Sequence, residues 1–204
     1  MAATDTLAGT RTAEVRDAPA AADVFVIFGI TGDLARVMTF LSLYRLELRG
    51  LLSCPVVGVA VDDWSRDQLV ERARSSIIAT GQSLDDEVFA RFVDRLAYVQ
   101  GDFSDAETYQ RVAAAIGDAR RPVFYLEIPP FLFGTVVKGL ATAGVSAHAR
   151  IVVEKPFGHD LASARALADE LHLYLRFANT ILEPVWNRNH VECVETTMTR
   201  ELRD

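Results

Sequence analysis

A buried-strand pattern that runs directly into a glycine turn and then a helical pattern is the feature that most restricts how this chain can fold. The strand residues are Val24-Phe25-Val26-Ile27-Phe28, and the turn is Gly29-Ile30-Thr31-Gly32. A continuous apolar run of β-branched and aromatic residues predicts a strand buried on both faces, as in parallel sheets. Gly29 and Gly32 allow a tight turn that exposes amide N–H groups at a helix start, where a phosphate binds well. Two glycines alone are a weak signal, and a turn needed only for packing is the alternative.

The alternation of strand and helix continues along the chain. Including the first strand, strands are expected at 23–28, 55–61, 98–99, 122–128 and 150–154, and helices at 34–48, 65–80, 84–96, 104–116, 131–143 and 160–172. Two of these helices open with the spacing of a capping box, at Ser65 and at Ser104. In the helix that follows the glycine turn, an apolar face is expected from the spacing of Leu34, Val37, Met38, Leu41, Tyr44 and Leu48. The whole pattern predicts the α/β class, with a doubly wound, Rossmann-like parallel sheet.

The chain divides into three segments of different character. Residues 1–22 are rich in Ala, Thr and Asp without periodicity and are expected to form a mobile tail. Residues 23–172 carry the alternating pattern and are interpreted as a dinucleotide-binding domain. Residues 173–204 turn irregular, and a segment of this length cannot form a hydrophobic core alone. We therefore expect one substantial domain followed by the remnant of another.

Charge and composition narrow the classes of partner. The 204 residues include 21 Lys and Arg against 28 Asp and Glu, a formal net charge of −7, and no cluster of basic residues stands out. This argues against nucleic acid as a partner but not against a small phosphorylated ligand. No apolar run approaches the roughly 20 residues of a membrane span, and no signal-peptide core is present, so a cytoplasmic location is expected. Cys54 and Cys193 lack metal-ligand spacing and are interpreted as free thiols in a reducing compartment.

Polar residues beside the turn and after the second strand are the first candidates for ligand binding. Thr31 offers a hydroxyl to a phosphate or a ribose, whereas Asp33 is expected to cap amides at the helix start. The second strand ends at Val61, Asp62 and Asp63. An acid at this place accepts hydrogen bonds from ribose hydroxyls, while an arginine would pair with a 2′-phosphate, so these residues favour NAD over NADP. Ordinary solvated loop aspartates are the alternative.

Two later strand ends should face the same crevice. Lys155 follows one strand, where it could hold a phosphate or polarise a substrate oxygen, and a surface lysine is the alternative. Pro129 and Pro130 end another strand, where they would either fix the backbone against a flat ring or only stop the strand. The chain's four histidines are His148, His159, His172 and His190. Since none has metal-ligand spacing or a nucleophile signal beside it, solvated or locally capped roles are expected, and no metal site is predicted.

Five stretches, taken in order, resemble glucose-6-phosphate dehydrogenase. They are Gly29-Ile30-Thr31-Gly32-Asp33-Leu34-Ala35, Phe124 to Pro130, Val153 to Gly158, Leu175 to Asn179 and Pro184 to Arg188. They match that family's Gly-x-x-Gly-Asp-Leu-Ala loop, its Phe-Tyr-Leu-x-x-Pro-Pro segment, its Val-Glu-Lys-Pro-Phe-Gly segment and two motifs just inside its second domain. Any one could arise by chance, whereas five in the right order over most of residues 23–194 indicate the family.

The resemblance implies a reaction and roles for particular residues. The expected reaction is oxidation of glucose 6-phosphate to 6-phosphogluconolactone, with hydride transfer to NADP, as the first step of the pentose phosphate pathway. By position, Gly29, Thr31 and Gly32, with Asp33 and Leu34 of the same loop, would hold the coenzyme's pyrophosphate region. Ile128 and Pro129 would line the nicotinamide site. Lys155 would contact both substrate and coenzyme.

Departures from the family pattern qualify these expectations. The arginine that usually reads the 2′-phosphate falls at Val61, with Asp62 next, so NAD is the alternative coenzyme. The family's Arg-Ile-Asp-His-Tyr-Leu-Gly-Lys segment, which holds the sugar phosphate, has no counterpart where Leu171 and His172 run into Leu173, which indicates an internal deletion. The family forms homo-oligomers through a second domain that is largely missing here.

These departures also bear on catalysis. A hydride transfer from a sugar hydroxyl needs a base within hydrogen-bond reach, and no histidine of this chain matches the family's base. Catalytic residues are therefore unassigned, and the polypeptide alone is expected to turn over little or no substrate. A non-catalytic nucleotide-binding or subunit-interaction module is the alternative function.

Overall fold

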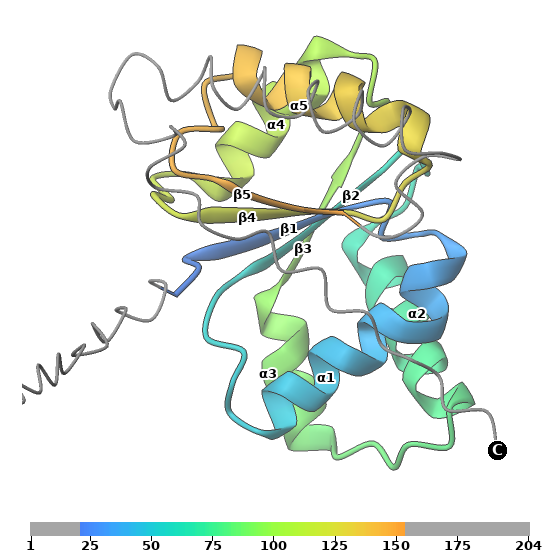
Figure 1. The fold of residues 1–204 in the computed structure, drawn as a ribbon. Coiled ribbons are helices and arrows are strands. Elements are labelled where there is room, and N and C mark those ends of the chain that lie inside the picture. Colours follow the sequence, from blue (N-terminus) through green and yellow to red (C-terminus); the bar gives the residue numbers. More distant parts are fainter. Residues whose placement is uncertain (1–20, 154–204) are drawn as a thin grey trace, which may run out of the picture.

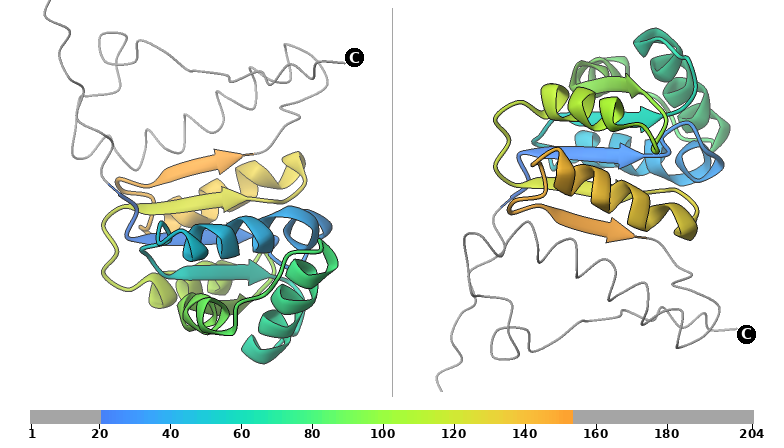
Figure 2. Two further views of the ribbon diagram at one scale, coloured as in Figure 1. Left: turned by 90° about the horizontal axis from the view of Figure 1, so that it is seen from below. Right: turned by 90° about the horizontal axis from the view of Figure 1, so that it is seen from above.

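Five parallel strands form the sheet at the centre of the domain. The computed structural model describes residues 21–153. The strands are β1 (Val24–Phe28), β2 (Val56–Ala60), β3 (Leu96–Gln100), β4 (Pro122–Leu126) and β5 (Arg150–Val153), in the sheet order β3-β2-β1-β4-β5. Every neighbouring pair is parallel, and the arrows in Figure 2 all run in one direction. The predicted α/β parallel sheet is confirmed. The predictions for residues 1–20, for the helix at 160–172 and for residues 173–204 lie outside the described residues.

Helices cover both faces of this sheet. They are η1 (Ala35–Thr39), α1 (Phe40–Leu48), α2 (Arg66–Ala79), α3 (Asp86–Arg95), α4 (Ala106–Ile116), η2 (Pro130–Leu132) and α5 (Phe133–Thr142). Figure 1 shows α1, α2 and α3 on one side of the sheet and α4 and α5 on the other. Each side has its own core, because alternate strand residues point to opposite faces: Ile27 joins the first core and Phe28 the second. Within residues 21–153, no helix is long and apolar enough to cross a membrane.

Side-chain caps explain where two of the helices begin. At α2 the predicted capping box forms: the Ser65 hydroxyl accepts from the Gln68 N–H at 3.2 Å, and the Gln68 side chain accepts from the Ser65 N–H at 2.7 Å. The box predicted at Ser104 is wrong. Asp105 is the N-cap of α4 and accepts from the Glu107 N–H, while Ser104 is turned back onto the Asp102 carboxylate. Because the Asp102 carboxylate accepts from Ser104, the N-cap lies one residue later than expected, at Asp105.

The helix after the glycine turn begins with a wider, π-helical turn. Residues Ala35–Thr39 form this turn, η1, and α1 continues from Phe40 without a break. The extra residue shifts the helical phase, so Ala35 and Thr39 are buried whereas Val37 and Met38 are more than half exposed. The apolar face predicted from regular spacing is therefore wrong for Val37 and Met38. It is also wrong for Leu48, which is 48% exposed at the end of α1, although Tyr44 is fully buried as expected.

A buried ion pair joins α1 to α3. The Glu47 side chain is only 4% exposed, and its carboxylate accepts from Arg95 Nε at 2.8 Å and from Arg91 Nε at 3.3 Å. Both arginine side chains are more exposed, Arg91 at 54% and Arg95 at 32%. The carboxylate therefore carries most of the desolvation cost, and the two arginines compensate it.

Candidate functional site: a coenzyme turn at the switch point of the sheet

The direction of chain winding reverses between β1 and β4. After β1 the chain adds β2 and β3 on one side of the sheet, and β4 and β5 then lie on the other side. In open α/β sheets ligands bind at such a switch point, outside the carboxyl ends of the strands. The residues that follow β1 and β4 are Gly29 and Glu127, and they meet there: the Glu127 N–H donates to the Phe28 carbonyl at 2.9 Å. The turn predicted to bind a phosphate thus occupies the expected place.

Glycine is required at position 29 for two reasons. Its φ of +88° lies in the left-handed region, which residues with a side chain rarely adopt. A Cβ built there would lie 2.3 Å from the Glu127 carbonyl oxygen and 2.9 Å from Ile128 Cγ2. The Gly29 N–H donates to the Val59 carbonyl at 2.8 Å, so the turn is fixed on both sides. This close packing explains the glycine structurally and also leaves the backbone open to a ligand.

Gly32 closes the turn and starts the helix. Its N–H donates to the Gly29 carbonyl at 2.9 Å, and its own carbonyl accepts from the Arg36 N–H at 3.1 Å. Helical hydrogen bonding therefore already begins at Gly32, and Leu34, half-buried, is inside the first turn. The exposed Gly32 carries no side chain that would block the approach of an anion to the amides of this turn.

Asp33 does not cap the helix as predicted. No side-chain cap is present at the start of η1, and the Asp33 carboxylate accepts from Arg36 Nε at 3.3 Å and Nη2 at 3.1 Å. The physical reason is the early helix start, which puts Asp33 inside the first turn and one turn before an arginine. Both side chains are at least half exposed, so this pair adds little stability.

Gly58 in β2 packs directly against the glycine turn, a contact that the sequence analysis did not identify. A Cβ at Gly58 would lie 2.7 Å from Ile30 Cγ2, and the Ile30 side chain is 1% exposed. Ile30 thus fills the space that Gly58 leaves and fixes the turn against β2. An isolated glycine inside an apolar strand is the signal that could have revealed this close approach.

Thr31 and Asp62 lie together, although they come from different loops. The Thr31 hydroxyl donates to Asp62 Oδ2 at 2.6 Å, and so joins the glycine turn to the residues that follow β2. The Asp62 carbonyl accepts from the Tyr98 hydroxyl at 2.6 Å and from the Trp64 N–H at 2.9 Å. Burial, with the nearby Asp62 and Asp63 carboxylates, raises the pKa of Tyr98 to about 12, so the phenol remains a donor. Asp62, although exposed, is therefore held in place by three residues.

The end of β4 supplies the other wall of the site. Ile128 is half-buried and packs on the core beneath α4 and α5, while Pro129 is exposed and precedes η2. A second link crosses the switch point here, because the Thr39 hydroxyl donates to the Glu127 carboxylate. The structure brings Ile128 and Pro129 to the same edge as Gly29. Lys155 lies outside the described residues.

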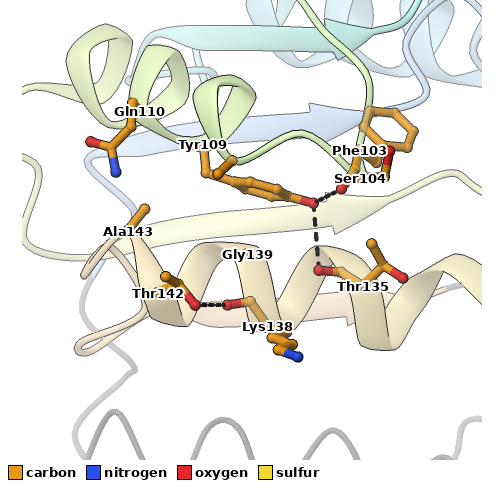
Figure 3. A pocket seen from close by; sticks show the side chains of 10 residues that line it. Phe103, Ser104, Tyr109, Gln110, Thr135, Lys138, Gly139, Thr142 and Ala143 are labelled. Carbon is orange, nitrogen blue, oxygen red and sulfur yellow. Dashed lines mark hydrogen bonds between the residues drawn. The ribbon is translucent and has the colours of Figure 1, made fainter.

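A hollow of about 340 Å³ between α4 and α5 is a poorer candidate (Figure 3). The Tyr109 ring lies over Gly139, where a Cβ would approach the ring to 2.2 Å. Its hydroxyl donates to the Phe103 carbonyl, and the Thr142 hydroxyl donates to the Lys138 carbonyl at 2.9 Å. These polar atoms are satisfied within the protein, so the hollow is explained by helix packing.

The chemistry available among the described residues is that of binding. A glycine turn at a helix start suits a phosphate, and the Asp62 carboxylate suits a hydroxyl. Residues 21–153 contain no group of three or more His, Cys, Asp or Glu side chains that could hold a metal ion. The histidine in this range, His148, is exposed at φ +57° in the loop before β5. It lies at the amino ends of the strands, whereas Gly29 lies at their carboxyl ends. No histidine is therefore placed at the switch point by residues 21–153.

Comparison with known proteins agrees with this geometry. Residues 26–180 match the family described as glucose-6-phosphate dehydrogenase, NAD binding domain. The chain is 47% identical to glucose-6-phosphate 1-dehydrogenase 1 of Mycobacterium tuberculosis (strain H37Rv), in a match that covers 89% of this chain and 44% of the relative. The crystal structure of glucose-6-phosphate 1-dehydrogenase from Mycobacterium avium superposes with a TM-score of 0.73 at 47% identity, over 83% of this chain and 43% of that one.

A more distant solved structure shows the same domain. It is a glucose-6-phosphate dehydrogenase in complex with its substrate glucose-6-phosphate, with a TM-score of 0.67 and 27% identity over 81% of this chain and 42% of that one. The chain thus spans less than half the length of the relatives that it matches. The predicted fold, and a coenzyme of the NADP and NAD class, are confirmed by the matched domain. The chain belongs to the glucose-6-phosphate dehydrogenase family of NAD(P)-dependent oxidoreductases.

Proposed function

We propose that this chain binds a nicotinamide dinucleotide at the switch point, with Gly29, Thr31, Gly32, Asp33 and Leu34 around its pyrophosphate. The observation that carries the proposal is the position of Gly29, pressed against the Glu127 carbonyl at the carboxyl ends of two central strands. At this place the amides of the turn meet an anion without an intervening side chain. The nicotinamide would then lie toward the end of β4.

Three further roles belong to the same proposal. Ile128 and Pro129 line the nicotinamide site, Asp62 meets the adenosine ribose, and Lys155 contacts substrate and coenzyme. The first two roles are supported by the contact of Ile128 with the Gly29 turn and by the Thr31–Asp62 hydrogen bond. The role of Lys155 rests on the family motif alone.

The reaction proposed for the protein is oxidation of glucose 6-phosphate to 6-phosphogluconolactone. The C1–H hydride passes to the nicotinamide, and the proton of the C1 hydroxyl passes to a base. The relatives' names and the substrate complex of one of them support this substrate. The match to the Mycobacterium tuberculosis relative spans 204 aligned positions but 89% of this chain, which fits the proposed internal deletion. A cytoplasmic location is part of the proposal, and the free thiol of Cys54 supports it.

A non-catalytic nucleotide-binding module is the second candidate. It is favoured by one observation: the described residues include the proposed coenzyme turn, while His148 lies in the loop before β5, at the other end of the strands. The two candidates agree on coenzyme binding and differ on turnover.

Coenzyme titration of the full 204-residue chain tests the shared part. We expect NADP or NAD to quench or shift tryptophan fluorescence, and a Gly32→Asp variant to bind at least about tenfold more weakly, because a carboxylate at the turn repels the phosphates. Gly50→Asp is the control: Gly50 is exposed with nothing within 4 Å of a built Cβ, and although its φ of +65° makes the variant less stable, the folded variant should bind normally.

Absorbance at the wavelength of the reduced nicotinamide, with glucose 6-phosphate present, separates the candidates. Turnover supports the dehydrogenase, and binding without turnover supports the module. Equal binding by Gly32→Asp and Gly50→Asp would contradict the placement of the coenzyme at this turn.

A further inference from the structure

We propose that Thr31 and Asp62 form a ribose clamp that selects a coenzyme with a free 2′-hydroxyl, so that this chain prefers NAD to NADP. The inference rests on the proposed coenzyme binding at the Gly29 turn and adds to it a choice of coenzyme. In this clamp Asp62 accepts a hydrogen bond from the ribose, and Thr31 is a positioning residue that orients Asp62.

The geometry of the Asp62 carboxylate suits this role. Its Oδ2 accepts from the Thr31 hydroxyl at 2.6 Å, a short bond to a charged acceptor, and this bond fixes the orientation of the carboxylate. Among the described residues, no hydrogen bond to Oδ1 accompanies it, so Oδ1 can accept from a ribose hydroxyl. Thr31 belongs to the proposed pyrophosphate turn, and the bond therefore sets the distance between the two ends of the adenosine diphosphate site.

The backbone under Asp62 is held as firmly as its side chain. Tyr98 and Gln100 of β3 donate to the carbonyls of Asp62 and Val61, at 2.6 Å and 3.2 Å, and the Trp64 N–H also donates to the Asp62 carbonyl. The loop after β2 is thereby tied to its neighbouring strand. A carboxylate on so fixed a backbone cannot easily turn away from an unfavourable ligand.

A 2′-phosphate would find negative charge and no basic residue at the end of β2. Val61 is 60% exposed, and Asp62 and Asp63 follow it. A phosphate placed against these two carboxylates is repelled, whereas a hydroxyl donates to one of them.

The arginines of the neighbouring elements are already engaged. Arg36 pairs with Asp33, and the Arg72 guanidinium lies 5.1 Å from the centre of the Trp64 ring. Arg66 donates to the carbonyls of Leu96 and Val93 at 2.8 Å and 2.6 Å. A 2′-phosphate bound by Arg36 would compete with the Asp33 carboxylate for the Nε and Nη2 donors of that arginine.

Dissociation constants of NAD and NADP, measured on the full chain by titration calorimetry, test the proposal through their ratio. For the unmodified chain we expect NAD to bind at least about tenfold more tightly, the scale of one hydrogen bond to a charged group. Asp62→Ser should abolish the preference, and Asp62→Ser combined with Val61→Arg should reverse it. Thr31→Val should weaken NAD several-fold more than it weakens NADP, while Thr31→Ser, which keeps the hydroxyl, should behave like the unmodified chain.

Each outcome decides the matter. Thermal melts confirm that the variants fold, which is expected because both side chains lie at the surface. Tighter binding of NADP by the unmodified chain overturns the clamp but leaves the proposed coenzyme site intact. An equal loss of both coenzymes in Thr31→Val leaves Thr31 with its pyrophosphate role alone and overturns the clamp. Binding of neither coenzyme by the folded chain overturns the clamp together with the proposed function.

Discussion

Substituting Gly29 by alanine should destabilise the whole domain, because the turn is both left-handed and tightly packed. The φ of +88° alone costs alanine about 1–2 kcal/mol. The new Cβ would also lie 2.3 Å from the Glu127 carbonyl oxygen, where ordinary contact begins at 3.4 Å, so the backbone at Glu127 must move by roughly an ångström. That movement strains the 2.9 Å bond from the Glu127 N–H to Phe28. Overpacking of this kind costs about 1–3 kcal/mol, so the free energy of unfolding should fall by about 3 kcal/mol in all.

Urea denaturation followed by circular dichroism measures this loss, and Gly81→Ala is the control. Gly81 has a similar φ of +77°, but nothing lies within 4 Å of its built Cβ, so this variant should lose only the left-handed cost of about 1–2 kcal/mol. The difference between the two variants isolates the packing against Glu127. If Gly29→Ala is no more destabilising than Gly81→Ala, the close contact across the switch point does not exist as described.

Two further predictions concern the packing on either side of the sheet. Glu47→Gln should lower the free energy of unfolding by about 2 kcal/mol, because the buried carboxylate loses charge-assisted bonds to Arg95 and Arg91. Arg91→Ala, at a half-exposed partner, should cost less than about 1 kcal/mol, and the reverse order in urea melts would refute this assignment. Burial raises the pKa of Tyr109 from 10.0 to about 12, so the folded chain retains a proton that the unfolded chain loses, and stability should fall as pH rises from 10 to 12. In Tyr109→Phe that fall should be shallower, and urea midpoints with the same pH dependence as the unmodified chain would contradict the raised pKa.

Local patterns predicted the elements of this fold well, because the forces that start and stop them act over a few residues. The apolar run at Val24–Phe28 is a buried central strand, and the serine and glutamine of one capping box bond as their spacing indicates. The alternation of such runs with helices was enough to predict a parallel sheet. The glycine turn was correctly placed between the first strand and the first helix for the same reason.

The errors arose where a distant or competing partner decided the local structure. Asp33 was expected to cap a helix, but the helix starts at Gly32 and Arg36 takes the carboxylate. Ser104 was expected to cap α4, but Asp102 accepts its hydroxyl. Regular helical spacing also could not reveal the π-helical turn that exposes Val37.

The contacts that build the candidate site were least accessible to sequence reasoning. Motif positions indicated that Thr31 and Asp62 both lie near a coenzyme, but their direct hydrogen bond depends on the register of β1 with β2. The fit of Ile30 over Gly58 depends on the same register. A one-residue shift of β2 would remove both contacts, so only the assembled sheet could show them.

The adjacency of β1 and β4 has a consequence for how the protein is made on the ribosome. The glycine turn is synthesised early, but the wall that presses on it follows β4, near the other end of the described domain. A nascent chain of which only β1, β2 and β3 have left the ribosome therefore lacks one wall of the proposed coenzyme site. Coenzyme bound at the proposed site can stabilise the domain only after Glu127 and Ile128 have emerged and β4 has inserted beside β1. Until then the edge of β1 that pairs with β4 has no neighbouring strand.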